Sequence, residues 1–288
     1  MADYRDLYYQ SPDGLRLYAR DYPCRSTDIS APETVLCMHG LTRNSADFAG
    51  LAEYLSQHYR VVSVDNRGRG LSEYDSNVAN YNPGVYVQDM FALLDELGIE
   101  QVILCGTSMG GLMSFMMGAM QPGRIRGMII NDICPEIDPA GLERIKSYVG
   151  KSQPVKTWKD AIAQAKAING IAFPDFTETQ WEDFTRGVYR EENGVPVLAY
   201  DPAIAQPMDD DESAAVPPDL WPLFEAITAI PMLVIRGITS DILAPSGVAG
   251  MRERKPDLQF VEIPNRGHAP TLDERESRAA IDSFLAAL

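Results

Sequence analysis

The sequence is poor in cysteine, which forms disulfides, and in histidine, which with cysteine forms most zinc sites. Of its 288 residues, four are cysteine and three are histidine. No Cys-x-x-Cys pair and no cysteine–histidine group has the spacing of a zinc site. We therefore expect no metal centre and no disulfide framework. Isolated cysteines of this kind are typical of proteins in the reducing cytoplasm, which is the predicted location.

Positive charge and long apolar runs are also scarce. The chain has 25 Lys and Arg against 41 Asp and Glu, a formal net charge of −16. Such a surface repels phosphate backbones and anionic lipid head groups, so we predict neither nucleic acid nor a membrane as a partner. The start, MADYRDLYYQ, has no signal-peptide pattern, and no apolar run approaches the length that spans a bilayer.

What the sequence does have is a regular alternation of apolar runs and helical periodicity. Strands are predicted at 34–40, 59–65, 101–106, 127–133, 231–237 and 258–264. Helices are predicted at 46–57, 85–98, 109–120, 247–254 and near the C-terminus. Strands that are apolar throughout are typical of a parallel sheet with helices on both faces.

The alternation stops between Pro135 and Ala229, where the pattern is helical, with loops and no clear buried strand. We therefore predict a two-part α/β core, residues 1–134 and 230–288, and a mainly helical insertion over 135–229. The acidic run at 209–212 within it reads as a solvated loop.

The strand predicted at 101–106 runs into the sequence GTSMGG, in which Ser108 lies between Gly106 and Gly110. A serine hydroxyl is a poor nucleophile unless a base removes its proton and its oxygen is held exposed. A sharp strand-to-helix turn exposes it, but the turn strains the serine backbone and needs small residues two positions away. Gly106 and Gly110 occupy those positions, so the pattern predicts a G-x-S-x-G nucleophile turn.

His268 is the histidine placed to act as the base, because its loop, NRGHAP, follows the last predicted strand. Asp241, in RGITSD, follows the preceding strand and could orient the imidazole. Asp132, in NDICPE, also follows a strand and is the alternative acid. We expect Ser108, Asp241 and His268 to meet where the carboxyl ends of the strands lie.

Five motifs together make the sequence resemble the α/β-hydrolase fold family over nearly the whole chain. They are HG (39–40), DNRGRGLS (65–72), GTSMGG (106–111), RGITSD (236–241) and GHAP (267–270). The resemblance implies the α/β-hydrolase fold, with a mostly parallel central sheet, helices on both faces and an inserted helical cap over 135–229. It also implies a Ser108–Asp241–His268 triad, an oxyanion hole made by the backbone N–H groups of Leu41 and Met109, and no cofactor.

Other polar and aromatic residues near these motifs have simpler interpretations. His39 fits a role in shaping the oxyanion loop. Arg67 and Arg69 are expected to tie down their loop by ion pairing rather than to bind an anionic substrate. Aromatic side chains of the insertion could line an apolar pocket or form its own small core. They are Trp158, Phe173, Phe176, Trp181, Phe184, Tyr189 and Trp221.

These features predict a cofactor-independent serine hydrolase that cleaves a carboxylic ester or lactone of small-molecule size. One alternative is a hydrolase that breaks a carbon–carbon bond in a vinylogous diketone with the same triad. Relatives with that activity commonly have tryptophan after the catalytic histidine, where this chain has Ala269. A second alternative is a receptor-like protein that binds a small molecule in a capped pocket.

Overall fold

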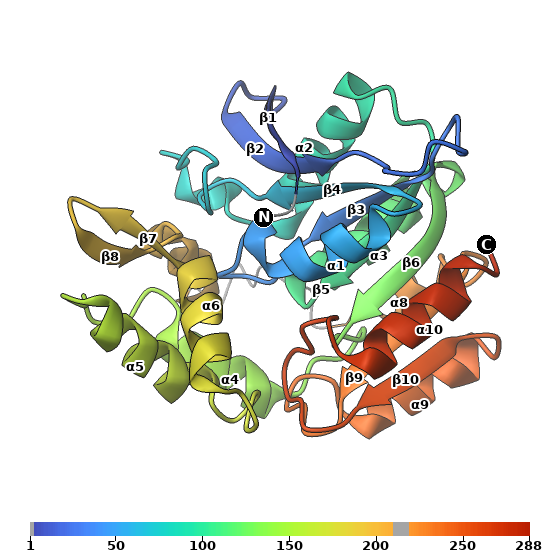
Figure 1. Cartoon of the computed structure of the whole chain (residues 1–288). Coiled ribbons are helices and arrows are strands. Elements are labelled where there is room, and N and C mark those ends of the chain that lie inside the picture. Colours follow the sequence, from blue (N-terminus) through green and yellow to red (C-terminus); the bar gives the residue numbers. More distant parts are fainter. Residues whose placement is uncertain (1–2, 210–218) are drawn as a thin grey trace.

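A computed structural model describes residues 3–209 and 219–288. Its centre is an eight-stranded sheet in the order β1-β2-β4-β3-β5-β6-β9-β10 (Figure 1). The strands are β1 (Arg5–Gln10), β2 (Arg16–Tyr22), β3 (Thr34–Met38), β4 (Arg60–Asp65), β5 (Val102–Thr107), β6 (Ile125–Asn131), β9 (Met232–Gly237) and β10 (Gln259–Ile263). The six strands from β4 to β10 run parallel, while β2 pairs antiparallel with both β1 and β4.

Helices cover both faces of the sheet, because alternate residues of each buried strand point to opposite sides. Leu36 and Leu104 pack in the apolar cluster that includes residues of α2 (Pro83–Glu96) and α3 (Met109–Met120). Their neighbours Val35 and Ile103 pack in the cluster on the other face. That second cluster includes residues of α1 (Ala49–Leu55) and α10 (Arg275–Leu285). The predicted parallel sheet between two helical layers is confirmed.

Local sequence signals explain where the core helices begin. Asn82 caps α2 by accepting a hydrogen bond from the N–H of Val85, and Pro83 occupies its first turn. The α9 helix (Pro245–Arg254) also begins at a proline and has two arginines in its last turn, where they favourably oppose the helix dipole. The core helices therefore start and stop close to the positions that the sequence predicts.

The segment between β6 and β9 is mostly helical. It contains α4 (Pro139–Tyr148), α5 (Trp158–Asn169), α6 (Glu178–Val188), α7 (Gln206–Asp209) and α8 (Trp221–Glu225). Helices α4, α5 and α6 lie beside the sheet (Figure 1), whereas α8 packs against α3 of the core. A short antiparallel hairpin, β7 (Tyr189–Glu192) with β8 (Val195–Leu198), was not predicted. Residues 210–218 of the predicted cap, which include most of the acidic run, lie outside the described residues.

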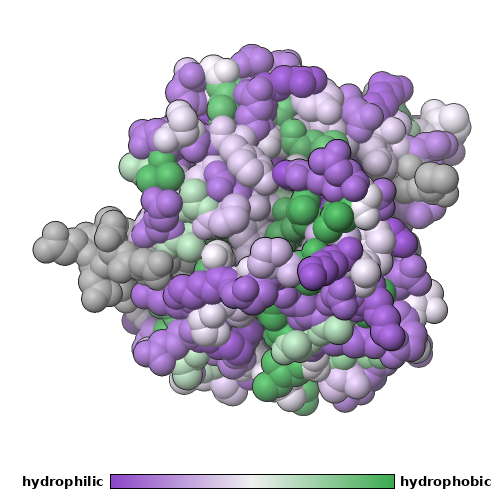
Figure 2. Space-filling view, turned by 90° about the vertical axis from the view of Figure 1, so that its left-hand side faces the viewer, coloured by the Kyte–Doolittle hydropathy of each residue, from purple (hydrophilic) through white to green (hydrophobic). Residues whose placement is uncertain are grey.

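The outer surface agrees with the acidic composition. The face on the side of α5 and the hairpin is mainly hydrophilic, and its apolar side chains form small separate groups (Figure 2). No helix in the described part of the chain has the length and apolar character to cross a membrane.

Candidate active site

Ser108 lies at the sharp turn between β5 and α3, where it is the N-cap residue of the helix. Its backbone has φ 52° and ψ −113°, a strained conformation that side-chain-bearing residues rarely adopt. The turn is held because the Ser108 N–H donates to the carbonyl oxygen of Asn131, at the end of β6 (2.9 Å). The fold therefore keeps Ser108 at the carboxyl end of the sheet in the strained conformation.

The two flanking glycines are required by close backbone contacts. A Cβ on Gly106 would lie 2.2 Å from the carbonyl oxygen of Gly110, and a Cβ on Gly110 would lie 2.0 Å from that of Met38. Real side chains do not approach backbone atoms this closely, so only glycine fits at either position. The structure bears out the sequence argument that small residues allow the turn around Ser108.

His268 reaches Ser108 from the loop that follows β10. The Ser108 Oγ lies 2.8 Å from His268 Nε2, and His268 Nδ1 lies 2.7 Å from Asp132 Oδ2. Because a carboxylate only accepts, Nδ1 carries a proton and donates it to Asp132, which leaves Nε2 to accept from the serine hydroxyl. The geometry matches a nucleophile, a base and an orienting acid in one hydrogen-bonded chain.

The acid in this chain is Asp132, which comes directly after β6. Its side chain is fully buried and its backbone has φ 60°. Besides His268, the carboxylate accepts from the N–H of Gly237 (2.8 Å) and from the hydroxyl of Ser240 (2.5 Å). Three donors fix both oxygens of Asp132 and stabilise their negative charge.

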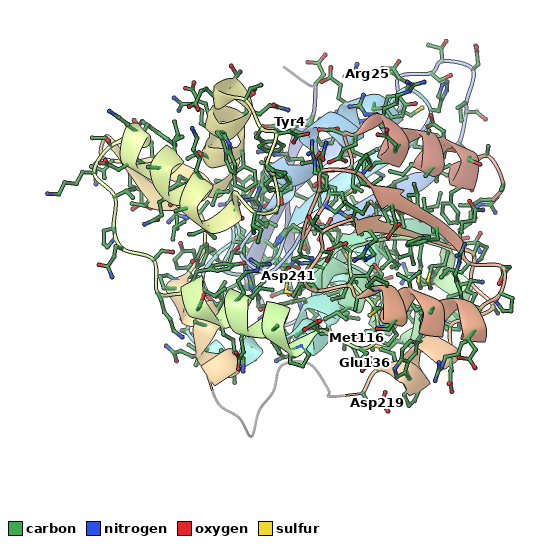
Figure 3. All side chains as sticks on the ribbon, turned by 90° about the horizontal axis from the view of Figure 1, so that it is seen from below. Tyr4, Arg25, Met116, Glu136, Asp219 and Asp241 are labelled. Carbon is green, nitrogen blue, oxygen red and sulfur yellow. The ribbon has the colours of Figure 1, made fainter. Side chains whose placement is uncertain are left out.

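Asp241 was predicted in this position, and the structure corrects that prediction. It lies beside α4 (Figure 3). Its side chain pairs with Arg144 of that helix. Arg144 donates to Asp241 through Nε and through Nη2 (2.9 Å to Oδ1). Burial would raise the pKa of Asp241, but the hydrogen bonds and charge of Arg144 outweigh it and lower the pKa. The turn after β9 thus brings Ser240 to Asp132 and leaves Asp241 to pair with α4.

The backbone expected to form the oxyanion hole lies next to the nucleophile. Met109 follows Ser108 as the first residue of α3, and Leu41 lines the cavity beside Ser108. A Cβ on Gly40 would lie 3.7 Å from the Cβ of Ser108, so the loop before Leu41 passes close to the serine. The two N–H groups therefore stay candidates for binding a developing oxyanion.

His39 fixes the Gly40–Leu41 loop through hydrogen bonds. Its Nδ1–H donates to the carbonyl oxygen of Gly40 (2.6 Å), and its Nε2 accepts from the N–H of Asn66 (3.0 Å). Burial lowers the pKa of His39 to about 3, so the ring is neutral near pH 7. This arrangement agrees with a shaping role for His39.

A cavity of about 930 Å³ opens over Ser108 and His268, between the core and the predicted cap. Its walls include Arg43, Tyr148, Phe173, Phe176, Phe184 and Tyr200. In the described part of the chain no group of His, Cys, Asp and Glu side chains is arranged to hold a metal ion.

Comparison with known proteins identifies the family and agrees with this fold. A family model described as the alpha/beta hydrolase fold matches residues 33–274. The chain belongs to the alpha/beta hydrolase family. An alpha/beta hydrolase from Novosphingobium aromaticivorans has the same fold over 100% of both chains, with a TM-score of 0.93 and 42% identity.

Two curated relatives of this hydrolase are named for different substrates. It is 36% identical over 264 residues, 89% of each chain, to the 3-hydroxybutyrate-oligomer hydrolase of Cupriavidus necator. It is 28% identical over 235 residues, 81% of each chain, to the 2-(acetamidomethylene)succinate hydrolase of Mesorhizobium japonicum. The family and the hydrolase class are thus common to these relatives, whereas their named substrates differ.

The two arginines of DNRGRGLS have structural partners in this alpha/beta hydrolase. Buried Arg67 pairs with Asp13 (2.9 Å), Asp75 (2.6 Å) and Asp89 (2.6 Å). Arg69 donates from Nε to the carbonyl oxygen of Leu41 (3.0 Å). Its partner here is thus the backbone of the Gly40–Leu41 loop, not an aspartate. Both arginines are buried and outside the cavity lining. The expected ion pairing is found for Arg67, whereas Arg69 holds its loop through hydrogen bonds to two carbonyl oxygens and the Tyr86 hydroxyl.

The cap aromatics of the hydrolase divide between the cavity and a small core behind it. Trp181 is buried and packs against three phenylalanines that line the cavity, Phe173, Phe176 and Phe184. Tyr189 also lines the cavity, whereas Trp158, Trp181 and Trp221 are outside its lining. Sequence spacing did not separate these two groups, because loops set the orientation of each helix.

Proposed function

We propose that this alpha/beta hydrolase is a serine hydrolase that cleaves carboxylic esters through an acyl-enzyme on Ser108. The observation that carries the proposal is the hydrogen-bonded chain from Ser108 through His268 to Asp132, which faces an open cavity. A receptor-like protein has no need of a strained serine that is hydrogen-bonded to an oriented imidazole.

In the first half of the reaction, the Ser108 oxygen attacks the ester carbonyl carbon while its proton moves to His268 Nε2. The buried Asp132 carboxylate stabilises the imidazolium that forms. The carbonyl oxygen becomes negative and would accept from the N–H groups of Leu41 and Met109. His268 then protonates the departing alkoxide, which leaves as the alcohol.

In the second half, water attacks the acyl-enzyme and gives its proton to His268 Nε2. The second tetrahedral intermediate collapses when the bond between its carbon and the Ser108 oxygen breaks. His268 returns its proton to that oxygen, and the carboxylic acid leaves. The net reaction adds one water across the ester bond and restores the enzyme.

Linear oligoesters of 3-hydroxy acids are the substrate class that we propose. The relative with 36% identity over 89% of each chain is named for 3-hydroxybutyrate oligomers. A cavity of about 930 Å³ is in the range that encloses ligands of such size, and its phenylalanine-rich wall suits an aliphatic chain. Lactones present the same carbonyl group to Ser108 and are the related substrates to compare.

The test is hydrolysis of p-nitrophenyl butyrate and of linear 3-hydroxybutyrate dimer by the wild type and by Ser108→Ala. We expect the wild type alone to release product from both. Equal release by the variant would show that Ser108 is not the nucleophile. A vinylogous diketone is the comparison substrate, and its faster turnover would replace the ester assignment while leaving Ser108 as the nucleophile.

A further inference from the structure

A positively charged side chain lines the cavity of this strongly acidic protein. Arg43 follows the Gly40–Leu41 loop and forms part of the cavity wall. Its Cγ and the Ser108 Cβ each lie 3.7 Å from the position that a Cβ on Gly40 would take. The stem of Arg43 and Ser108 therefore flank the same glycine, and both residues line the same cavity.

The Arg43 guanidinium is fixed on one edge and free on another. Its Nε and Nη2 donate to Asp47 (2.8 and 2.6 Å), and its plane lies over the Phe184 ring, 4.1 Å from the centroid. Within residues 3–209 and 219–288, Nη1 makes no hydrogen bond. An arginine has five N–H donors in a rigid fork, so this pairing leaves donors for an anion that enters the cavity.

Tyr148 of α4 lines the same cavity and adds a second donor. Burial raises the pKa of Tyr148, whereas the charges of Arg144 and Arg43 act in the opposite direction. The hydroxyl therefore stays protonated near pH 7 and lies in the field of two guanidinium groups. A carboxylate there would meet a charged fork from the core and a hydroxyl donor from α4.

We propose that Arg43 and Tyr148 form a subsite for the free carboxylate of the substrate. The inference rests on the proposed function, because a linear oligoester ends in a carboxylate two carbons from its last ester oxygen. Charge-assisted hydrogen bonds from a guanidinium would place that end while the last ester bond faces Ser108. Asp47 competes for the same guanidinium and weakens the subsite.

The test compares linear 3-hydroxybutyrate dimer with its methyl ester, which has the same internal ester bond but no negative charge. Cleavage of that internal bond is followed by chromatography of the products. Arg43→Gln should lower the ratio of kcat/KM for the acid to that for the methyl ester about tenfold, mainly through KM for the acid. Asp47→Asn should raise the ratio, because it removes the competing carboxylate.

Arg124→Gln is the matched control, since Arg124 is as exposed as Arg43 (21% against 20%) and also pairs with an aspartate, but lies outside the cavity lining. For Arg124→Gln, the ratio of kcat/KM for the acid to that for the methyl ester should stay at the wild-type value. An unchanged ratio in Arg43→Gln, or a fall of the same size in Asp47→Asn, would overturn the subsite. If the wild type cleaves neither compound, the proposed substrate class fails and the subsite fails with it.

Discussion

At the scale of single residues, the site depends on which carboxylate meets His268. Asp132 and Asp241 both follow strands that end at the same edge of the sheet, so sequence position alone does not separate them. Contacts separate them in the structure. Asp132 is buried and receives three hydrogen bonds, whereas Asp241 is partly exposed and paired with Arg144.

Asp132→Asn should lower kcat for ester hydrolysis by about 10⁴-fold, because the amide favours the wrong imidazole tautomer and does not stabilise the imidazolium. Asp241→Asn should change kcat by less than about tenfold, because its partner is Arg144 rather than His268. Steady-state kinetics on p-nitrophenyl butyrate measure both. A larger loss in Asp241→Asn than in Asp132→Asn would contradict the assignment of the acid.

His39 predicts a pH dependence of folding stability. Its pKa is lowered from the ordinary value of 6.5 to about 3 by burial, so the unfolded chain binds a proton in this range that the native state does not. The stabilisation is present above pH 6.5 and is lost as the pH falls toward 3. The free energy of unfolding in urea should fall less steeply with pH for His39→Gln than for the wild type between pH 6.5 and 4.5. The difference in slope should be up to about 1.4 kcal/mol per pH unit. Equal slopes would contradict this origin.

At the scale of elements, the strand–turn–helix unit β5–α3 presents the nucleophile. The first turn of α3, which contains Gly110, lies against the backbone of β3, since a Cβ added to Gly110 would lie only 2.0 Å from the carbonyl oxygen of Met38. A second element, the loop after β10, carries His268. It is held by the loop that follows α5, because the Gly267 N–H donates to the carbonyl oxygen of Ala172 (2.9 Å). Ser108 and His268 are thus both positioned by backbone contacts.

Gly110→Ala should destabilise the protein by about 1–3 kcal/mol or more, because the helix must move away from β3 to accept the methyl group. Movement of Ser108 should lower kcat as well. Gly123→Ala is the control, since a Cβ there meets nothing within 4 Å. Urea unfolding and kcat, measured together, check the prediction. If the two variants behave alike, the close contact with Met38 does not hold the turn.

The elements that the sequence predicted well are those with strong, uniform signals. The strand predicted at 101–106 is β5, which spans 102–107, and the helix predicted at 85–98 is α2, which spans 83–96. The hairpins β1–β2 and β7–β8 were missed because their strands mix charged and apolar residues and lie partly exposed. The choice between Asp132 and Asp241 needed the path of the turn after β9, which residue spacing does not encode.

At the scale of the whole molecule, one ionic cluster ties distant segments together near the site. Arg67 has a side-chain exposure of 1% and contacts carboxylates from the β1–β2 turn, the loop after β4 and α2. It also accepts, through its carbonyl oxygen, a hydrogen bond from Arg69, which in turn holds the loop of Leu41. Removing this charge would leave the buried Asp89 without its partner.

Arg67→Met should lower the free energy of unfolding by about 3–5 kcal/mol, the cost of leaving a buried charge uncompensated. Arg124→Gln, which removes a more exposed pair with Asp95, should cost no more than about 1 kcal/mol. Urea unfolding followed by circular dichroism gives both values. Comparable losses in the two variants would contradict a stabilising role for the buried cluster.

The most direct test of Ser108 as the nucleophile is to find the residue to which a serine-directed phosphonate attaches. An uncharged fluorophosphonate reacts fast only with a serine that has a base and an oxyanion hole. Intact-mass and peptide mass spectrometry should find one adduct per chain, located on Ser108, and none on Ser108→Ala. An adduct at another residue, or equal labelling of the variant, would contradict the assignment of Ser108 as the nucleophile.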